Sequence, residues 1–156
     1  MTAADDPTAT PPAVDELAGK LKRTEVQRST SSIPGRDIVQ VLTEIPAGVE
    51  SGWHTHPGEE VGYILAGTVT MRIHDQSTLT LHAGDGFLIP PGVPHNALDV
   101  GPDTGQMLST YIVDPARPLA TFTAPQPTSD APPANAGSVN TIARRHDAHP
   151  TEGRRP

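Results

Sequence analysis

Short runs in which apolar and polar residues alternate fill the middle of the chain, between residues 26 and 112. Val69, Met71 and Ile73, for example, alternate with polar residues and would share one face of a β-strand. Gly, Pro and Asp separate the runs at intervals of about 8 to 12 residues, which is typical of an all-β sandwich or barrel, and such short turns favour antiparallel pairing. We predict strands over residues 37–45, 52–56, 60–66, 68–74, 78–82, 86–89, 95–100 and 106–113.

In the segment before this β region, the apolar residues recur with the period of a helix instead of a strand. Val14, Leu17 and Leu21 recur at helical spacing, with acidic residues at the start of the segment and basic residues near its end. We therefore predict one short amphipathic helix ahead of the first strand, and a flexible lead over residues 1–12.

The alternation ends after Phe122. Residues 124–156 are rich in Pro, Ala and Thr, and the chain as a whole has 18 prolines and 35% hydrophobic residues. This composition predicts one folded domain over residues 13–123, followed by a disordered tail. His146 and His149 lie in that tail, where we expect them to be solvated.

The charge balance narrows the choice of partners. A net charge of −7 gives no basic surface for nucleic acid or an anionic membrane, so a small molecule is the better candidate. The chain has no cysteine, no apolar run of about 20 residues that would span a membrane, and no signal-peptide pattern at its start. We expect a cytoplasmic protein.

Histidine and glutamate residues supply the candidate chemistry. His54 and His56 are two residues apart, so on a strand their imidazoles would leave the same face and converge on one ion. Glu60 follows four residues later, and His95 lies downstream. Imidazole and carboxylate without thiolate suit iron, manganese, nickel, copper or zinc, and argue against a closed structural zinc site.

The spacing of these residues resembles the cupin superfamily. Asp99 stands where the second motif of that family ends in Asn, a position that is not a metal ligand in the family. The other positions of the two motifs match at Gly48, His54, His56, Glu60 and Gly67, and at Gly84, Pro90, Gly92 and His95. The glycines themselves are expected to serve turns and tight packing, not chemistry.

The resemblance implies a double-stranded β-helix, or jelly-roll barrel. It further implies that His54, His56, Glu60 and His95 point into the mouth of the barrel and bind one divalent transition metal, with Fe2+ favoured and Mn2+, Ni2+, Zn2+ or Cu2+ as alternatives. Cupins commonly dimerise through N-terminal strands, so the resemblance also implies a homodimer formed through residues 23–33.

Several reactions remain open for such a site. Four ligands would leave two positions on an octahedral ion, which favours a non-haem Fe(II) dioxygenase acting on a small organic substrate, with Glu60 as a possible internal base. The alternatives are a Lewis-acid isomerase, lyase or decarboxylase, and a non-catalytic small-molecule binder. Tyr63 and Tyr111 are expected to be core or interface residues, and Tyr63 has the opposite strand parity from Glu60.

Overall fold

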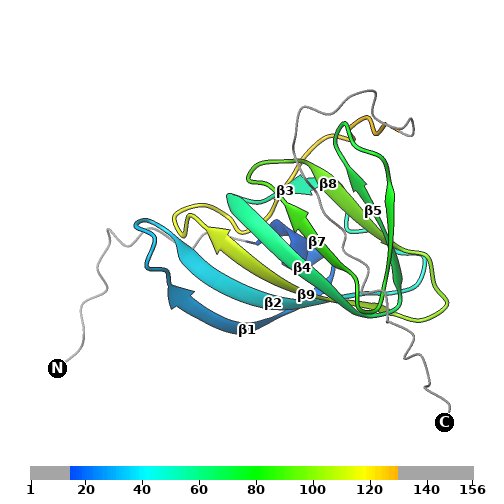
Figure 1. Ribbon diagram of the computed structural model, residues 1–156, viewed down its shortest axis with the longest axis horizontal. Helices are drawn as coiled ribbons and strands as arrows, with labels where there is room; N and C mark the ends of the chain where they lie inside the picture. Colours follow the sequence, from blue (N-terminus) through cyan, green and yellow to red (C-terminus); the bar gives the residue numbers. More distant parts are fainter. Residues whose placement is uncertain (1–14, 130–156) are drawn as a thin grey trace, which may run out of the picture.

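Two five-stranded sheets form the domain (Figure 1). The computed structural model describes residues 15–129, and every strand pair in it is antiparallel. The strand orders are β1-β2-β9-β4-β7 and β10-β3-β8-β5-β6. In chain order the elements are η1 (Glu16–Gly19), β1 (Lys22–Thr30), β2 (Asp37–Ile45), β3 (His54–Thr55), β4 (Gly58–Ala66), β5 (Thr68–Ile73), β6 (Leu79–His82), β7 (Gly86–Ile89), β8 (His95–Asp99), β9 (Gly105–Val113) and β10 (Thr121–Phe122).

The core lies between the two sheets. Burial alternates along the strands, so that in β2 Val39, Val41 and Ile45 are buried while their neighbours are partly exposed. The predicted alternation in β5 is confirmed, because Val69 and Met71 are buried together with Ile73 on one face. Strands such as β2 and β5 thus contribute one apolar face to the interior, as expected for a β-sandwich or jelly roll.

The sequence pattern located the strands well. Every segment predicted as a strand overlaps one, and the bounds of β2 and β7 match those predicted. The largest difference is β3, which is two residues long instead of five and pairs with β8 only at His54 and His95. Strands β1 and β10 were not predicted, because the alternation in β1 is polar on both faces and β10 is only two residues long.

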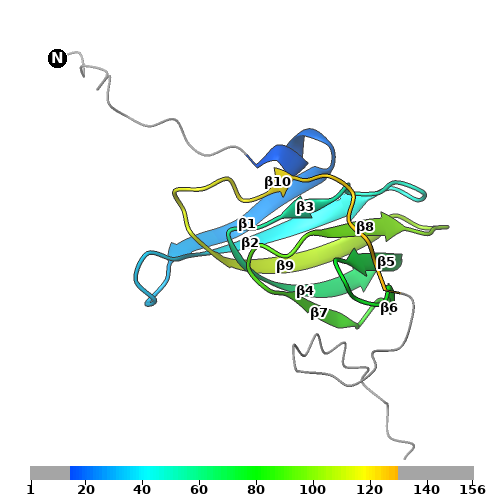
Figure 2. The same cartoon turned by 90° about the horizontal axis from the view of Figure 1, so that it is seen from above.

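The predicted N-terminal helix is a single 3-10 turn. Its spacing signal was correct for Leu17 and Leu21, which are both buried, and Asp15 caps the turn by accepting a hydrogen bond from the Leu17 amide. The helix does not continue, because Lys22 and Arg23 already belong to β1, which pairs along nearly its whole length with β2. Figure 2 shows this dark-blue turn beside β10.

The motif glycines occupy turns, as expected. Gly48, Gly67, Gly84 and Gly92 all have positive φ. Gly67 joins β4 to β5 at φ +80°, and a Cβ there would lie 2.8 Å from Gly105 Cα. A side chain at this position would therefore force the backbone to shift.

Residues just beyond the expected domain boundary at residue 123 still contact the domain. The Asp75 amide donates to the Pro127 carbonyl over 3.1 Å, and the Ser129 amide donates to Gln76 over 3.0 Å, so residues 124–129 lie against the turn between β5 and β6. The expected lead over residues 1–12 and most of the expected tail, including both of its histidines, lie outside the described residues. Within residues 15–129, no helix has the length and apolar character needed to cross a membrane.

Candidate metal centre

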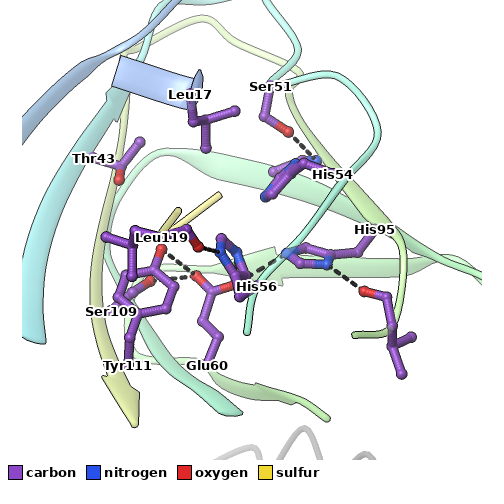
Figure 3. Close-up of polar contacts among 12 residues, drawn as sticks. Leu17, Thr43, Ser51, His54, His56, Glu60, His95, Ser109, Tyr111 and Leu119 are labelled. Carbon is purple, nitrogen blue, oxygen red and sulfur yellow. Dashed lines mark hydrogen bonds and ion pairs between the residues drawn. The ribbon is translucent and has the colours of Figure 1, made fainter. Parts of the chain in front are cut away.

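Four buried side chains from both sheets meet inside the barrel (Figure 3). His54 lies on β3, His56 follows that strand, and His95 begins β8, whereas Glu60 projects from β4 in the opposite sheet. The three imidazoles have ligand atoms within 4.8 Å of one another. Glu60 joins this cluster through Oε2, which lies 3.1 Å from the Nε2 atoms of both His56 and His95.

Backbone carbonyls orient all three imidazoles. Nδ1 of His54 lies 2.7 Å from the Gly52 carbonyl, Nδ1 of His56 lies 2.6 Å from that of Leu119, and Nδ1 of His95 lies 2.9 Å from that of Val93. A carbonyl oxygen only accepts, so each Nδ1 carries the proton. In a neutral imidazole the lone pair is then on Nε2, which is the usual arrangement for histidine ligands.

The electrostatics of the cluster favour a neutral His54. Burial, followed by the charges of His95 and His56, holds the pKa of His54 well below its ordinary value. The imidazole therefore keeps a free lone pair at neutral pH, which a metal ligand requires.

The donor set fits a divalent metal ion. His56 Nε2 is buried and has no hydrogen-bond partner among the described residues, although the Glu60 carboxylate lies close to it. A hydrogen bond from His95 Nε2 to Glu60 would require a doubly protonated ring, because Nδ1 already donates to Val93. A cation between these atoms satisfies them without that proton. Nitrogen and oxygen donors of this kind suit several divalent metals, so they do not select one.

Two hydroxyl donors hold the other oxygen of Glu60. Ser109 Oγ donates to Oε1 over 2.7 Å and Tyr111 Oη donates to it over 3.0 Å. Burial would raise the pKa of Glu60, but the neighbouring His56 and His95 outweigh it and keep that pKa well below its usual range. Burial, together with the charge of Glu60, raises the pKa of Tyr111. The carboxylate is therefore ionised with Oε2 facing the imidazoles, and the phenol keeps its proton.

A buried arginine extends this network toward the N-terminal turn. The side chain of Arg23 is only 2% exposed, and its Nη1 and Nη2 each donate to Tyr111 Oη over 3.3 Å. It also donates to Thr43 Oγ1 over 2.9 Å and to Asp15 Oδ2 over 2.8 Å. Asp15, Arg23, Tyr111 and Glu60 thus form one continuous chain of polar contacts that ends at the histidine cluster.

The centre faces a cavity of about 10 Å³, which is room for about one water molecule. Leu17 and Leu21 from the N-terminal segment help to close it. The full lining consists of Leu17, Leu21, Arg23, Thr43, Ser51, His54, Glu60, Met71, His95, Ala97, Met107 and Tyr111.

Sequence reasoning did not identify Ser109, Tyr111 and Arg23 as neighbours of the centre. Tyr111 was expected in the core or an interface; it is buried, but its hydroxyl binds Glu60 directly. Strand parity places Ser109 and Tyr111 on one face, yet only the register of β4 with β9, which sets Glu60 opposite Tyr111, shows that this face meets the carboxylate. Arg23 lies outside both motifs and inside the segment expected to be helical. Tyr63 faces away from the centre, as its parity predicted, and is 47% exposed.

Comparison with known proteins agrees with this architecture. The family described as "Cupin domain" matches residues 41–111, which contain every strand that carries a candidate ligand. No curated protein matches the sequence.

Solved structures resemble the fold at low sequence identity. A conserved protein with a double-stranded β-helix domain from Klebsiella pneumoniae is 21% identical, with 69% of this chain and 87% of that one covered and a TM-score of 0.56. A conserved protein of unknown function from Streptococcus pyogenes is 26% identical over 60% of this chain and 75% of that one, with a TM-score of 0.49. Oxalate decarboxylase from Bacillus subtilis is 21% identical over 55% of this chain and 23% of the enzyme, with a TM-score of 0.49. Residues 41–111 therefore match the family of cupin domains, and the two facing antiparallel sheets, together with the similarity to the Klebsiella structure, show a jelly-roll fold like that of cupins.

Proposed function

We propose that the protein is a metal-dependent enzyme acting on a small organic molecule, and that His54, His56, Glu60 and His95 hold the metal. Among the possible reactions we favour oxygenation by O2 at a non-haem Fe(II) ion. One observation supports the proposal above all: three imidazoles have ligand atoms within 4.8 Å of one another, and Oε2 of Glu60 lies 3.1 Å from two of them, beside a small cavity that His54, Glu60 and His95 line.

A bound divalent ion would supply Lewis acidity and, as Fe(II), the capacity to activate O2. The chain supplies the orientation. Backbone carbonyls aim the imidazoles, and Ser109 and Tyr111 occupy Oε1 of Glu60 so that the other carboxylate oxygen faces the histidines. Preorganised donors of this kind need no rearrangement when a metal binds.

The scarcity of a free proton acceptor favours oxygenation over isomerisation or elimination. Among the described residues, Glu60 is the only carboxylate lining the cavity. One of its oxygens already accepts two hydrogen bonds, and the other faces His56 and His95, so the contacts support a role as ligand more than as base. Tyr111 is no base either, since its pKa is raised. Small apolar O2 suits Leu17, Met71 and Met107 as neighbours.

The test is metal content and oxygen uptake on anaerobically purified full-length protein, with thiols, catechols and β-diketones as candidate substrates. We expect about one equivalent of iron and oxygen consumption that depends on one substrate class. His95→Ala should lose both properties. His82→Ala is the matched control, because that side chain is 57% exposed and lies on the far edge strand β6.

Other outcomes point to the alternatives. Zinc, manganese or nickel without oxygen uptake would overturn the oxygenase and support a Lewis-acid reaction. Absence of any stoichiometric metal would overturn the enzyme proposal and support a binding role.

A further inference from the structure

A cleft of about 510 Å³ lies next to the metal centre. The smaller cavity at the histidines has room for about one water, so an organic molecule needs space elsewhere. Arg23 lines both spaces and stands between them. The cleft is lined by Asp15, Ala18, Arg23, Glu25, Arg28, Val41, Val113, Asp114, Pro115, Arg117 and Leu119.

Arg23 carries a buried positive charge that pairs with a single carboxylate within residues 15–129. Asp15 provides it, and Thr43 and Tyr111 are neutral. Asp15 itself is less deeply buried, with a side chain 21% exposed against 2% for Arg23. It belongs to the N-terminal turn, not to either sheet. The carboxylate on Arg23 is therefore held by a short 3-10 turn that is not hydrogen-bonded into either sheet as a strand.

The remainder of the cleft suits an apolar group. Val41 and Val113 are buried side chains on the inner faces of β2 and β9, and Leu119 packs against the same cluster. Arg28, the next cation along β1, is already paired with Glu25 over 2.9 Å. Arg23 differs from it because its guanidinium contacts Tyr111, which in turn donates to Glu60.

We propose that the cleft binds a small organic carboxylate with an apolar body, and that the carboxylate of this ligand takes the place of Asp15 on Arg23. The apolar body lies over Val41, Val113 and Leu119. Asp15 thus acts as an internal stand-in for the ligand. The identification of this ligand as a substrate rests on the proposed function, whereas its binding to Arg23 does not.

Displacing Asp15 also opens the centre. Leu17 and Leu21 close the small cavity, and the same segment is held by Asp15 on Arg23, by Glu16 accepting from the Phe122 amide over 2.6 Å, and by the Glu16 amide donating to Ala120. A ligand that removes the first of these contacts weakens the attachment of the turn. Carboxylate binding and access to the histidines are therefore coupled through one short segment.

The test is titration calorimetry of the full-length protein with acetate and benzoate, and with acetamide and benzamide as uncharged counterparts. In the wild type the carboxylates compete with Asp15. Asp15→Asn removes that competitor, so benzoate affinity should rise roughly tenfold or more, the range of a charge-assisted hydrogen bond. Adding Arg23→Gln to Asp15→Asn should abolish the gain. Benzoate should bind more tightly than acetate, and the amides should not respond to either change.

Glu44→Gln is the matched control, because this carboxylate pairs with Lys22 across β1 and β2 and is not among the described residues that line the cleft. It should leave benzoate affinity unchanged. Unchanged affinity in folded Asp15→Asn protein would overturn the proposal, as would loss of binding with Arg28→Gln or Arg117→Gln instead of Arg23→Gln. Circular dichroism establishes that each variant is folded.

Repeating the titration after chelation separates this inference from the proposed function. Binding through Arg23 should persist without metal. If benzoate binding is lost with the metal and does not depend on Arg23, the inference is overturned, because the carboxylate would then be a metal ligand. Failure to turn over any substrate would instead overturn only the enzymatic role.

Discussion

The two sides of the candidate metal centre are held in different ways. On the histidine side, the carbonyls of Gly52, Val93 and Leu119 fix the three rings. On the glutamate side, the hydroxyls of Ser109 and Tyr111 fix the carboxylate. The first set of contacts belongs to the main chain, and the second depends on particular side chains.

This difference separates what the fold supplies from what the residue choice supplies. A carbonyl remains in place whatever side chain its residue carries, so the histidine orientation follows from the path of the backbone. The hydroxyls disappear with one substitution each, and behind them Arg23 reaches the neighbouring cleft. The glutamate side is therefore where the centre can be adjusted to a particular ligand.

Removing a candidate ligand should have the largest effect. His95→Ala takes away one of three converging imidazoles, and stoichiometric metal should be lost from the purified protein. The two sheets have their own apolar core, so the far-ultraviolet circular dichroism should keep its β signature. Metal analysis of the variant checks this, and full metal content would contradict the ligand assignment.

Acid should destabilise the protein once its metal has been removed. The pKa of native His54 lies well below the ordinary 6.5, so just below pH 6.5 the unfolded chain binds a proton that the native protein does not. This contribution is fully present above pH 6.5 and is lost as pH falls, at a rate of at most about 1.4 kcal/mol per pH unit.

Urea unfolding of the chelated protein over a pH series measures that slope. His54→Gln should flatten it, because the variant has no proton to bind at this position. A slope equal to that of the wild type would show that other groups cause the acid sensitivity.

Loss of the hydroxyls on the glutamate side should weaken metal binding without abolishing it. We expect Ser109→Ala and Tyr111→Phe each to lower metal affinity about 10- to 100-fold, as is common for partners that orient a ligand. Competition with a chelator measures the affinity. Thr110→Val is the control, since Thr110 lies between them on β9 but contacts Gln40. Equal losses of metal affinity from all three substitutions would show that the two faces of β9 do not differ in their effect on the metal.

Side-chain changes on the histidine side should have the smallest effect. Val93→Ala keeps the carbonyl that orients His95, so metal affinity should change by less than about threefold. The same chelator competition applies. A loss of affinity as large as that from Ser109→Ala would show that the ligands on both sides of the centre depend on neighbouring side chains. The histidine side and the glutamate side would then not differ in this respect.

The fold could be predicted from the sequence because its signals are local. The alternation in β5, the turn at Gly67 and the spacing of His54 and His56 each depend on a few consecutive residues. The short helix expected around Leu17 and Leu21 is present as a single 3-10 turn, for a related reason. Its spacing signal was real, but pairing of β1 with β2 begins at Lys22 and leaves room for only one turn.

The candidate site was predictable only in part. His95 could be joined to the other ligands through the resemblance to a known family, since periodicity cannot bring residues forty positions apart together. Tyr111 and Arg23 were missed because neither belongs to the matched motifs. Their place depends on the register of β9 against β4 and of β1 against β2.

By itself, the sequence determined most of the strand segments, the turns and the closely spaced candidate ligands His54, His56 and Glu60, because periodicity, glycine geometry and ligand chemistry are properties of short stretches of chain. Only the tertiary structure decided which side chains surround those ligands. It placed the hydroxyls of Ser109 and Tyr111 on Glu60, and it set Arg23 between the centre and the cleft. Strand register and the packing of one sheet on the other are long-range choices, and they fix which distant residues meet.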